Sequence, residues 1–225
     1  MGPAASAVLF DIDGTLPDTA PAIVAAVNEA IPDRGLRPFS IDELRPLFGR
    51  PVQAQLEVLR GVTGPEADAF TDRYYDRFMA RMESAVVVYP GVRKTLPRLT
   101  AARIGTISTR RAKEARRMLE FARLATHFTW IVGGDQVARP KPDPDLPLLA
   151  ARRLGADPTA CVVVGDSPVD VLAGKAGGCG PSRSRTATGI RRRSARRDPM
   201  RRATGSSGSR TSWTRRGRRP TEARP

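Results

Sequence analysis

Histidine and cysteine are scarce in this sequence, which has one His and two Cys among its 225 residues. Ser-His-Asp or Cys-His catalysis would have to use His127, which precedes the apolar stretch FTWIV and is interpreted as a packing residue. Cys161 and Cys179 have neither a metal-binding nor a redox spacing, which favours a reducing cytoplasm. The chemistry of this chain must therefore be sought in other side chains.

Long apolar runs are also missing from the sequence. No stretch approaches the ~18 residues that a membrane-spanning helix needs, so no membrane partner is expected. The N-terminus has no charged segment that leads into an apolar one, so no signal peptide is predicted. These absences favour a cytoplasmic location.

Lysine is absent from residues 179–225, although the whole chain has a formal net charge of +15. This segment contains 15 Arg and two acidic residues, Asp198 and Glu222, so it carries +13 of that charge. The first 178 residues are therefore nearly neutral. The Arg-rich composition predicts a disordered tail, and binding of nucleic acid through this tail is the less favoured alternative.

Arg without Lys, mixed with Ser, Gly, Thr and Pro, is also what GC-rich DNA encodes when it is read out of frame. Joining the third base of each codon from Gly178 onward to the first two bases of the next gives codons compatible with LRTVAVTYGYG. That sequence predicts a β-strand followed by a glycine turn. We therefore interpret residues 179–225 as an out-of-frame tail, with an evolved basic tail as the alternative.

The first 178 residues alternate between patterns typical of strands and patterns typical of helices. The strands are predicted at residues 7–10 (AVLF), 104–108 (IGTIS), 129–134 (TWIVGG) and 160–166 (ACVVVGD). The helices between the later strands are predicted at residues 93–103, 112–124 and 144–155. Strands separated by helices favour a parallel sheet with crossover helices.

Residues 18–85 contain only helical patterns, which follow directly after the first predicted strand. Their segments are 18–31, a capping-box helix from SIDE at 40–43, 49–62 and 64–82, the last with the apolar stripe Phe70, Tyr74, Phe78 and Met82. The predicted fold is therefore α/β, with a Rossmann-like parallel sheet core at residues 1–17 and 86–178. An all-helical cap at residues 18–85 is inserted into this core.

Polar side chains follow the predicted strands, at the sheet edge where such folds bind ligands. They are Asp11, Asp13, Ser108, Thr109, Lys141, Asp166 and Asp170. Massed carboxylates repel each other, and a hard cation relieves this repulsion. Mg²⁺ prefers a few carboxylate oxygens and waters, and a lysine and a hydroxyl beside it suit a phosphate.

The segment FDIDGT places two carboxylates one residue apart. Asp11 could attack phosphorus, because aspartate forms acyl-phosphate intermediates. Asp13 could give a proton to the leaving oxygen and later take one from water. Gly14 permits a tight turn, and Thr15 can hydrogen-bond within it. An Asx-turn without any chemistry is the alternative at this point.

Five motifs together resemble those of the haloacid-dehalogenase-superfamily hydrolases, and in particular of phosphoglycolate-phosphatase-like members. They are FDIDGTLPDTAPAI, GRP at 49–51, YPGV at 89–92, GGDQVARPKPDPD and VVVGDSPVD. The resemblance covers about residues 6–178 and implies a helical cap inserted after the first strand. Family members continue after Gly178 with a further strand and a final helix, so the last strand of this chain is expected to be missing.

The resemblance also implies a role for each site residue. Asp11 is the expected nucleophile, Asp13 the acid/base, and Ser108 and Lys141 hold the phosphoryl group. The expected Mg²⁺ ligands and their support are Asp11, the Asp13 carbonyl, Asp166 and Asp170, the last of which orients Lys141 or the metal-bound waters. The expected substrate contacts are Thr15, Thr109 and Arg50, the last from the cap.

Three residues depart from the family pattern without removing a required group. Ser108 stands where threonine is more usual, Thr109 where asparagine or serine is frequent, and Pro17 where a larger apolar residue is common. Pro17 predicts a different entry into the cap. Asp13 itself argues against a dehalogenase, because dehalogenases lack a carboxylate at this position.

The sequence therefore predicts a Mg²⁺-dependent phosphatase of a small, phosphoglycolate-like phosphorylated metabolite, acting as a monomer or dimer through an aspartyl-phosphate. A sugar phosphomutase is the alternative within the same enzyme class. An inactive out-of-frame product and a nucleic-acid binder acting through the basic tail are the alternatives outside it.

Overall fold

The computed structural model describes residues 6–31, 36–99 and 103–180. Within these ranges a parallel three-stranded sheet has the order β2-β1-β3. The strands are β1 (Ala7–Phe10), β2 (Arg103–Thr106) and β3 (Cys161–Val164). The four apolar residues of β1 are all buried, as expected for a central strand that is covered on both faces. The predicted α/β class is confirmed.

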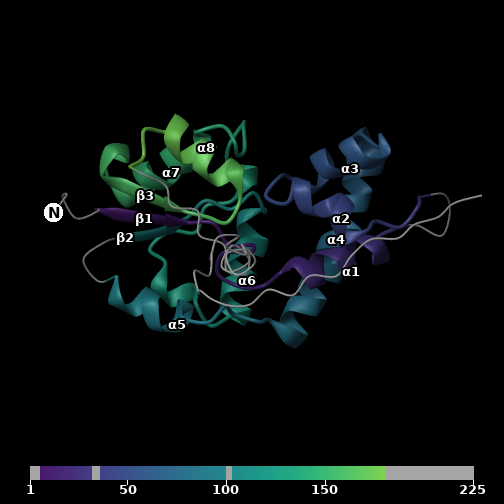
Figure 1. Ribbon diagram of the computed structural model, residues 1–225, viewed down its shortest axis with the longest axis horizontal. Helices are drawn as coiled ribbons and strands as arrows, with labels where there is room; N and C mark the ends of the chain where they lie inside the picture. Colours follow the sequence, from purple (N-terminus) through teal and green to yellow (C-terminus); the bar gives the residue numbers. More distant parts are fainter. Residues whose placement is uncertain (1–5, 32–35, 100–102, 181–225) are drawn as a thin grey trace, which may run out of the picture. The chain divides into compact units, whose positions relative to one another are not determined.

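Helices cover both faces of this sheet (Figure 1). On one side lie α7 (Asp145–Leu154) and α8 (Pro168–Ala176). On the other side lie α5 (Val92–Thr95) and α6 (Ala112–Phe121). The arrangement is the layered one that parallel strands with crossover helices require.

Successive residues of β1 face opposite layers, because side chains alternate along a strand. Ala7 and Leu9 belong to the apolar cluster that contains the buried residues of α7. Val8 and Phe10 belong to a second cluster, which contains the buried residues of α6 and of the helices between β1 and β2. The central strand therefore holds both halves of the core together.

Residues 129–134 form only part of the predicted strand. Trp130 makes one parallel bridge with Gly105, and Thr129, Trp130 and Val132 exchange backbone hydrogen bonds with residues 104, 106 and 108, so the segment lies beside β2 as far as Val132. Glycine contacts explain the difference, since a Cβ on Gly133 would lie 2.2 Å from the backbone nitrogen of Ala112, and one on Gly134 2.5 Å from the carbonyl oxygen of Thr109. This close approach to the loop after β2 ends the pairing beyond Val132.

The predicted helix at 93–103 is shorter than expected. Here α5 ends at Thr95 and a 3₁₀ turn covers Leu96–Arg98, while Arg103 already belongs to β2. Pro97 lies in that turn and lacks the amide hydrogen that an α-helix would need. The segment therefore changes to a tighter turn.

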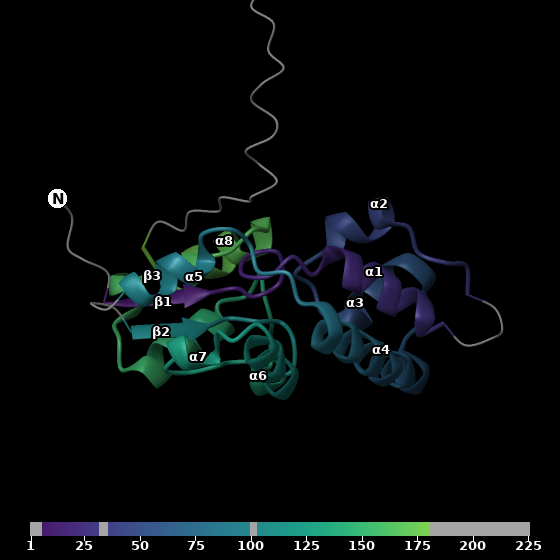
Figure 2. The same cartoon turned by 90° about the horizontal axis from the view of Figure 1, so that it is seen from below.

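Five α-helices lie between β1 and β2 along the described chain, and Figure 2 shows the first four of them as one group. These four are α1 (Ala20–Glu29), α2 (Ile41–Leu44), α3 (Val52–Arg60) and α4 (Gly64–Ala85). The predicted apolar stripe of α4 is buried. The capping box of α2 is present, with Ser40 and Glu43 bonded to each other's backbone N–H.

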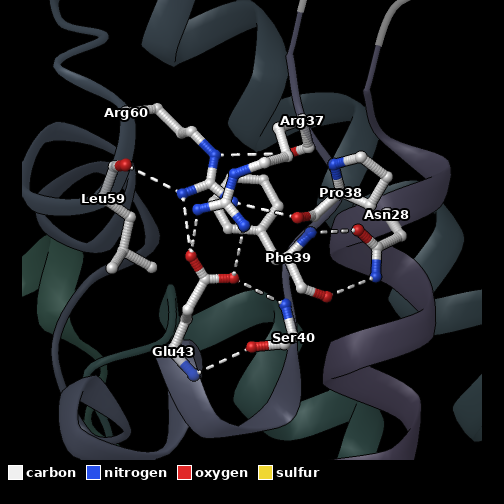
Figure 3. Close-up of polar contacts among 8 residues, drawn as sticks. All are labelled: Asn28, Arg37, Pro38, Phe39, Ser40, Glu43, Leu59 and Arg60. Atoms are coloured by element: carbon white, nitrogen blue, oxygen red, sulfur yellow. Dashed lines mark hydrogen bonds and ion pairs between the residues drawn. The ribbon is translucent and has the colours of Figure 1, made fainter. Parts of the chain in front are cut away.

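Arg60 fixes the chain that leads into α2 (Figure 3). Its guanidinium carbon lies 4.0 Å from the centre of the Phe39 ring. The same group donates hydrogen bonds to the carbonyl oxygens of Arg37 and Pro38, at 3.2 and 3.0 Å. Asn28 of α1 holds Phe39 from the other side, accepting from its N–H at 2.7 Å. The α1, α2 and α3 segments are thereby joined.

The described chain ends beside β3. Gly180 bridges Val162 in parallel, and its N–H donates to the carbonyl oxygen of Cys161 at 2.8 Å. Cys179 is buried, so the first two residues of the predicted tail pack against the sheet. Residues 181–225, with the rest of that tail, lie outside the described residues. No helix in the described ranges combines the length and apolar character needed to cross a membrane.

Candidate active site

The strand register brings the predicted residues to one edge of the sheet. Phe10 pairs with Thr106 on one side and with Val164 on the other. The next residue, Asp11, donates its N–H to the carbonyl oxygen of Val164 at 2.8 Å. Ser108 and Asp166 each follow two residues after the last residue of β2 and β3. The three chain segments therefore end in polar residues at the same level.

Lys141 joins two of the carboxylates. Its Nζ lies 2.6 Å from Asp11 Oδ1 and 2.6 Å from Asp170 Oδ1, and its side chain is completely buried. Burial alone would lower the pKa of Lys141, but Asp11 and Asp170 hold this pKa above its ordinary value. The lysine is therefore a fixed positive charge beside Asp11.

Asp170 is held in place from its other oxygen. The backbone N–H and the hydroxyl of Ser167 donate to Asp170 Oδ2, at 3.0 and 2.6 Å, in the capping box that opens α8. Both oxygens of Asp170 are therefore engaged, one by the helix start and the other by Lys141. A local capping pattern thus positions the lysine.

Asp11, Asp166 and Asp170 form a carboxylate cluster, in which one oxygen of each lies within 4.8 Å of the others. Burial, followed by the charges of Asp170 and Asp13, raises the pKa of Asp166 to about 6. Gly14, at φ +75°, approaches Asp166 so closely that a Cβ would lie 2.4 Å from Asp166 Oδ2. The turn after β1 therefore packs directly on this carboxylate.

The charges in this cluster suit a divalent cation. Three carboxylates and the single ammonium of Lys141 leave a surplus of two negative charges when all are ionised. The donors are hard oxygens, which Mg²⁺ prefers. Burial raises the pKa of Asp11, with Lys141 acting in the opposite direction, so a further positive charge would favour its ionised form. The residues present therefore fit the expected metal.

The side chain of Asp13 points to a different partner. Its Oδ2 and Oδ1 accept hydrogen bonds from Nε and Nη2 of Arg110, both at 2.7 Å. Burial would raise the pKa of Asp13, but the charge and hydrogen bonds of Arg110, with a hydrogen bond from Thr19, hold it below its ordinary value. Asp13 is outside the carboxylate cluster, and its expected metal contact was through its carbonyl.

Sequence reasoning missed Arg110, which is 5% exposed. Its Nη1 donates to the hydroxyl of Tyr74 at 3.3 Å, and its guanidinium carbon lies 3.7 Å from the centre of the Phe78 ring. Both aromatic residues belong to α4. Its position two residues after Ser108 was the sequence signal that could have placed Arg110 at the site. The Arg110 N–H donates to the Ser108 hydroxyl at 3.2 Å.

A cavity of about 980 Å³ opens at this edge of the sheet. Among the predicted site residues, those that line it are Asp11, Asp13, Arg50, Thr109 and Asp166. Those that are buried and do not line it are Ser108, Lys141 and Asp170. The cavity also has lining residues that were not predicted: Asp18, Thr19, Asn28, Arg45, Tyr74, Tyr75, Tyr89 and Arg110.

Thr15 differs from its expectation. It does not line the cavity, and its buried hydroxyl has no hydrogen-bond partner among the described residues. The turn bond is made by its backbone instead, since the Thr15 N–H donates to the carbonyl oxygen of Ile12 at 3.2 Å. The backbone geometry of the glycine turn therefore replaces the expected side-chain bond.

Comparison with known proteins gives the same assignment from independent matches. Residues 8–180 match the family described as haloacid dehalogenase-like hydrolase. A phosphoglycolate phosphatase from Xanthomonas campestris pv. campestris (strain 8004) is 35% identical over 176 residues, covering 76% of this chain and 79% of that protein. The pyrophosphatase PpaX from Bacillus velezensis is 31% identical over 175 residues, covering 77% and 80%.

A solved structure agrees with these sequence matches. The crystal structure of a putative haloacid dehalogenase-like hydrolase from Bacteroides fragilis has a TM-score of 0.70 at 30% identity, and the match covers 82% of this chain and 91% of that one. In this chain the fold brings Asp11, Asp166 and Lys141 together at one edge of the parallel sheet. The chain therefore belongs to the haloacid dehalogenase-like hydrolase family.

Proposed function

We propose that this protein hydrolyses a small phosphorylated metabolite, with Mg²⁺ and through a phosphorylated Asp11. The observation that carries the proposal is Lys141, which contacts Asp11 and Asp170 at 2.6 Å next to the third carboxylate, Asp166. A nucleophile, a fixed positive charge and a set of metal ligands are the parts that phosphoryl transfer requires.

The proposed reaction begins at Asp11, whose carboxylate oxygen attacks phosphorus and forms an acyl-phosphate. The bond between phosphorus and the ester oxygen breaks, and Asp13, which takes up a proton from solvent in the enzyme–substrate complex, gives that proton to the oxygen as the alcohol leaves. Asp13 then takes a proton from a water molecule that attacks the same phosphorus. The acyl-phosphate is cleaved, inorganic phosphate departs, and Asp11 regains its carboxylate.

The surrounding residues hold the phosphoryl group during both steps. In this proposal Lys141 and the hydroxyl of Ser108 bind its non-bridging oxygens, and the two aspartate partners of Lys141 keep it charged. Asp11, Asp166 and the carbonyl of Asp13 would hold Mg²⁺, supported by Asp170. The ion would neutralise charge on the phosphoryl oxygens and on the carboxylate cluster.

The lining of the cavity supports an anionic substrate. Its polar side chains from the strand ends face Arg45 and Arg50 of the α2–α3 region, which can contact an anionic group beyond the phosphate. Relatives carry the name phosphoglycolate phosphatase, which supports this compound as the first substrate to test. A cytoplasmic location and a monomeric or dimeric state stay part of the proposal.

Release of inorganic phosphate tests the proposal. The purified full chain is incubated with 2-phosphoglycolate and with p-nitrophenyl phosphate, with Mg²⁺ and with excess chelator. We expect turnover of both esters with Mg²⁺ and its loss on chelation. Equal turnover in chelator contradicts the metal requirement. An isomerised sugar phosphate without free phosphate, obtained from a hexose phosphate, would identify a phosphomutase instead.

A further inference from the structure

We propose that Arg110 selects esters with a second negative charge, a carboxylate one or two carbons from the ester oxygen. In this proposal the substrate carboxylate takes the place of Asp13 on Arg110 and so releases Asp13 for its role in the reaction. The inference rests on the proposed phosphatase function of the same site.

The ion pair occupies the whole carboxylate of Asp13. Arg110 Nε bonds Oδ2 and Nη2 bonds Oδ1, each at 2.7 Å. While this two-bond pairing holds, both oxygens are directed at Arg110, and the ionised carboxylate has no proton to give to the ester oxygen of a substrate at Asp11. Asp13 must therefore turn away from Arg110 before it can act.

Arg110 is fixed and cannot follow this movement. Its remaining guanidinium nitrogen bonds the Tyr74 hydroxyl at 3.3 Å, its carbon packs 3.7 Å from the Phe78 ring centre, and its backbone N–H bonds Ser108. If Asp13 turned away alone, a guanidinium that is 5% exposed would be left without a counter-charge. An uncompensated buried charge is strongly unfavourable.

A carboxylate on the substrate removes this obstacle. The ester oxygen must lie beside Asp13 to receive its proton, so the carbons attached to that oxygen lie beside Arg110, which also lines the cavity. A carboxylate there matches the guanidinium fork as Asp13 did. A neutral ester offers no replacement, so it leaves either Asp13 held or Arg110 unpaired. Selectivity follows from that difference.

The other arginines of the cavity are not paired with Asp13. Arg45 and Arg50 line the same space, but both are exposed, and the structure gives neither an ion pair with Asp13. They can attract an anion without affecting the acid/base residue. Among the described arginines of the cavity, Arg110 therefore joins substrate recognition to the release of Asp13.

Binding of two inert analogues to the unchanged full chain gives the first test. With Mg²⁺ present, calorimetry compares 3-phosphonopropionate, which has a carboxylate, with 3-hydroxypropylphosphonate, which has a neutral hydroxyl at the same place. We expect the carboxylate to bind about tenfold to a hundredfold more tightly, the range of a charge-assisted hydrogen-bonded pair. Equal affinities would overturn the proposal.

Kinetics of matched variants give the second test. Arg110→Lys keeps the charge but loses the two-bond fork. Arg111→Lys is the control, because Arg111 also joins this loop to α4, through Asp72 at 2.8 Å and Tyr75, without contacting Asp13. The substrates are 2-phosphoglycolate and 2-hydroxyethyl phosphate. For Arg110→Lys we expect the ratio of kcat/KM for 2-phosphoglycolate to kcat/KM for 2-hydroxyethyl phosphate to fall about tenfold or more, and for Arg111→Lys we expect this ratio to stay unchanged.

The outcomes separate this inference from the proposed function. If the unchanged chain hydrolyses neither ester nor p-nitrophenyl phosphate, the proposed function fails and the inference with it. If Arg110→Lys lowers both activities equally, Arg110 is structural and only the inference fails. A loss of carboxylate preference in Arg50→Lys but not in Arg110→Lys would assign recognition to Arg50 and overturn the proposal. If Arg110→Lys does not melt cooperatively, the analogue affinities of the unchanged chain decide.

Discussion

Replacing one carboxylate oxygen of Asp11 by an amide nitrogen should stop the reaction while the fold is kept. Its Oδ1 contacts Lys141, which keeps Asp170 as a second partner at the same distance. An amide in place of the carboxylate keeps the shape of the side chain but cannot form the acyl-phosphate. The fold can therefore survive a change that stops turnover.

We predict that Asp11→Asn lowers kcat by about a thousandfold or more, as expected when a nucleophile is lost. Phosphate release from 2-phosphoglycolate measures the effect, and circular dichroism checks the fold. Asp42→Asn, which changes an exposed carboxylate of α2, is purified in the same way as a control for contaminating phosphatase. Retention of more than about a hundredth of the activity would exclude Asp11 as nucleophile.

The raised pKa of Asp166 predicts how Mg²⁺ binding depends on pH. Its pKa of about 6 lies above that of an ordinary aspartate, so below pH 6 the folded site holds a proton there that Mg²⁺ must displace. The proton on Asp166 should therefore lower Mg²⁺ affinity about tenfold between pH 7 and 5. Calorimetric titration measures it, with Asp166→Asn as the control that removes this contribution and leaves that of Asp11, whose pKa burial also raises. An unchanged affinity at pH 5 would contradict the assignment of Asp166 as a ligand.

The sequence predicted the carboxylates and Lys141 because each follows a local apolar strand or a short polar motif. It did not predict the partner of Asp13, because that ion pair joins residues 97 positions apart and depends on how Arg110 packs against α4. The pairing expected over 129–134 ends early, at Val132, for a related reason. Its apolar letters favour a strand, but the contacts of Gly133 and Gly134 with a distant loop decide its path.

At the scale of elements, the loop between α2 and α3 depends on a glycine. Gly49 has φ +88°, and a Cβ there would lie 2.9 Å from Val169 Cγ2 and 3.0 Å from Ser167 Oγ. Ser167 holds Asp170, which in turn contacts Lys141. A methyl group at Gly49 would therefore push the loop away from the start of α8 or disturb the support of the lysine.

We predict that Gly49→Ala lowers kcat/KM for 2-phosphoglycolate about tenfold and costs about 1 kcal/mol of stability. Gly61→Ala is the matched control, because Gly61 also has a positive φ, of +68°, but its Cβ would meet nothing within 4 Å. It should lose similar stability and keep its activity. Melting curves and steady-state kinetics test both variants, and equal activities would show that the Gly49 contact does not matter.

At the scale of the whole molecule, the outer edge of β3 is only slightly paired. In the described residues, the pairing on that side is a single bridge between Val162 and Gly180. A parallel strand that lacks a neighbour exposes backbone groups and apolar surface. The out-of-frame interpretation supplies a neighbour, because the shifted codons can encode LRTVAVTYGYG from this point.

We predict that restoring the frame near Gly178 raises Tm by about 10 °C or more, since 1 kcal/mol shifts Tm by about 2–4 °C in a domain of this size. Hydrogen exchange at residues 162–164 should slow at the same time. A chain cut after Gly180 separates gain of a strand from loss of the tail. If the present chain protects β3 as well as the restored one and is equally active, residues 179–225 are a genuine part of the protein.

The central position of β1 has a consequence during synthesis. This strand is made first, yet its partners begin at residues 103 and 161, and Lys141 follows Asp11 by 130 residues. At ribosomal rates of about 5–20 residues per second, the four apolar residues of β1 wait roughly ten to thirty seconds for their second neighbour. A nascent chain shorter than about 170 residues lacks Asp170 and cannot assemble the site. Until residues 103–106 and 161–164 have been made, β1 is therefore an apolar strand with both edges unpaired.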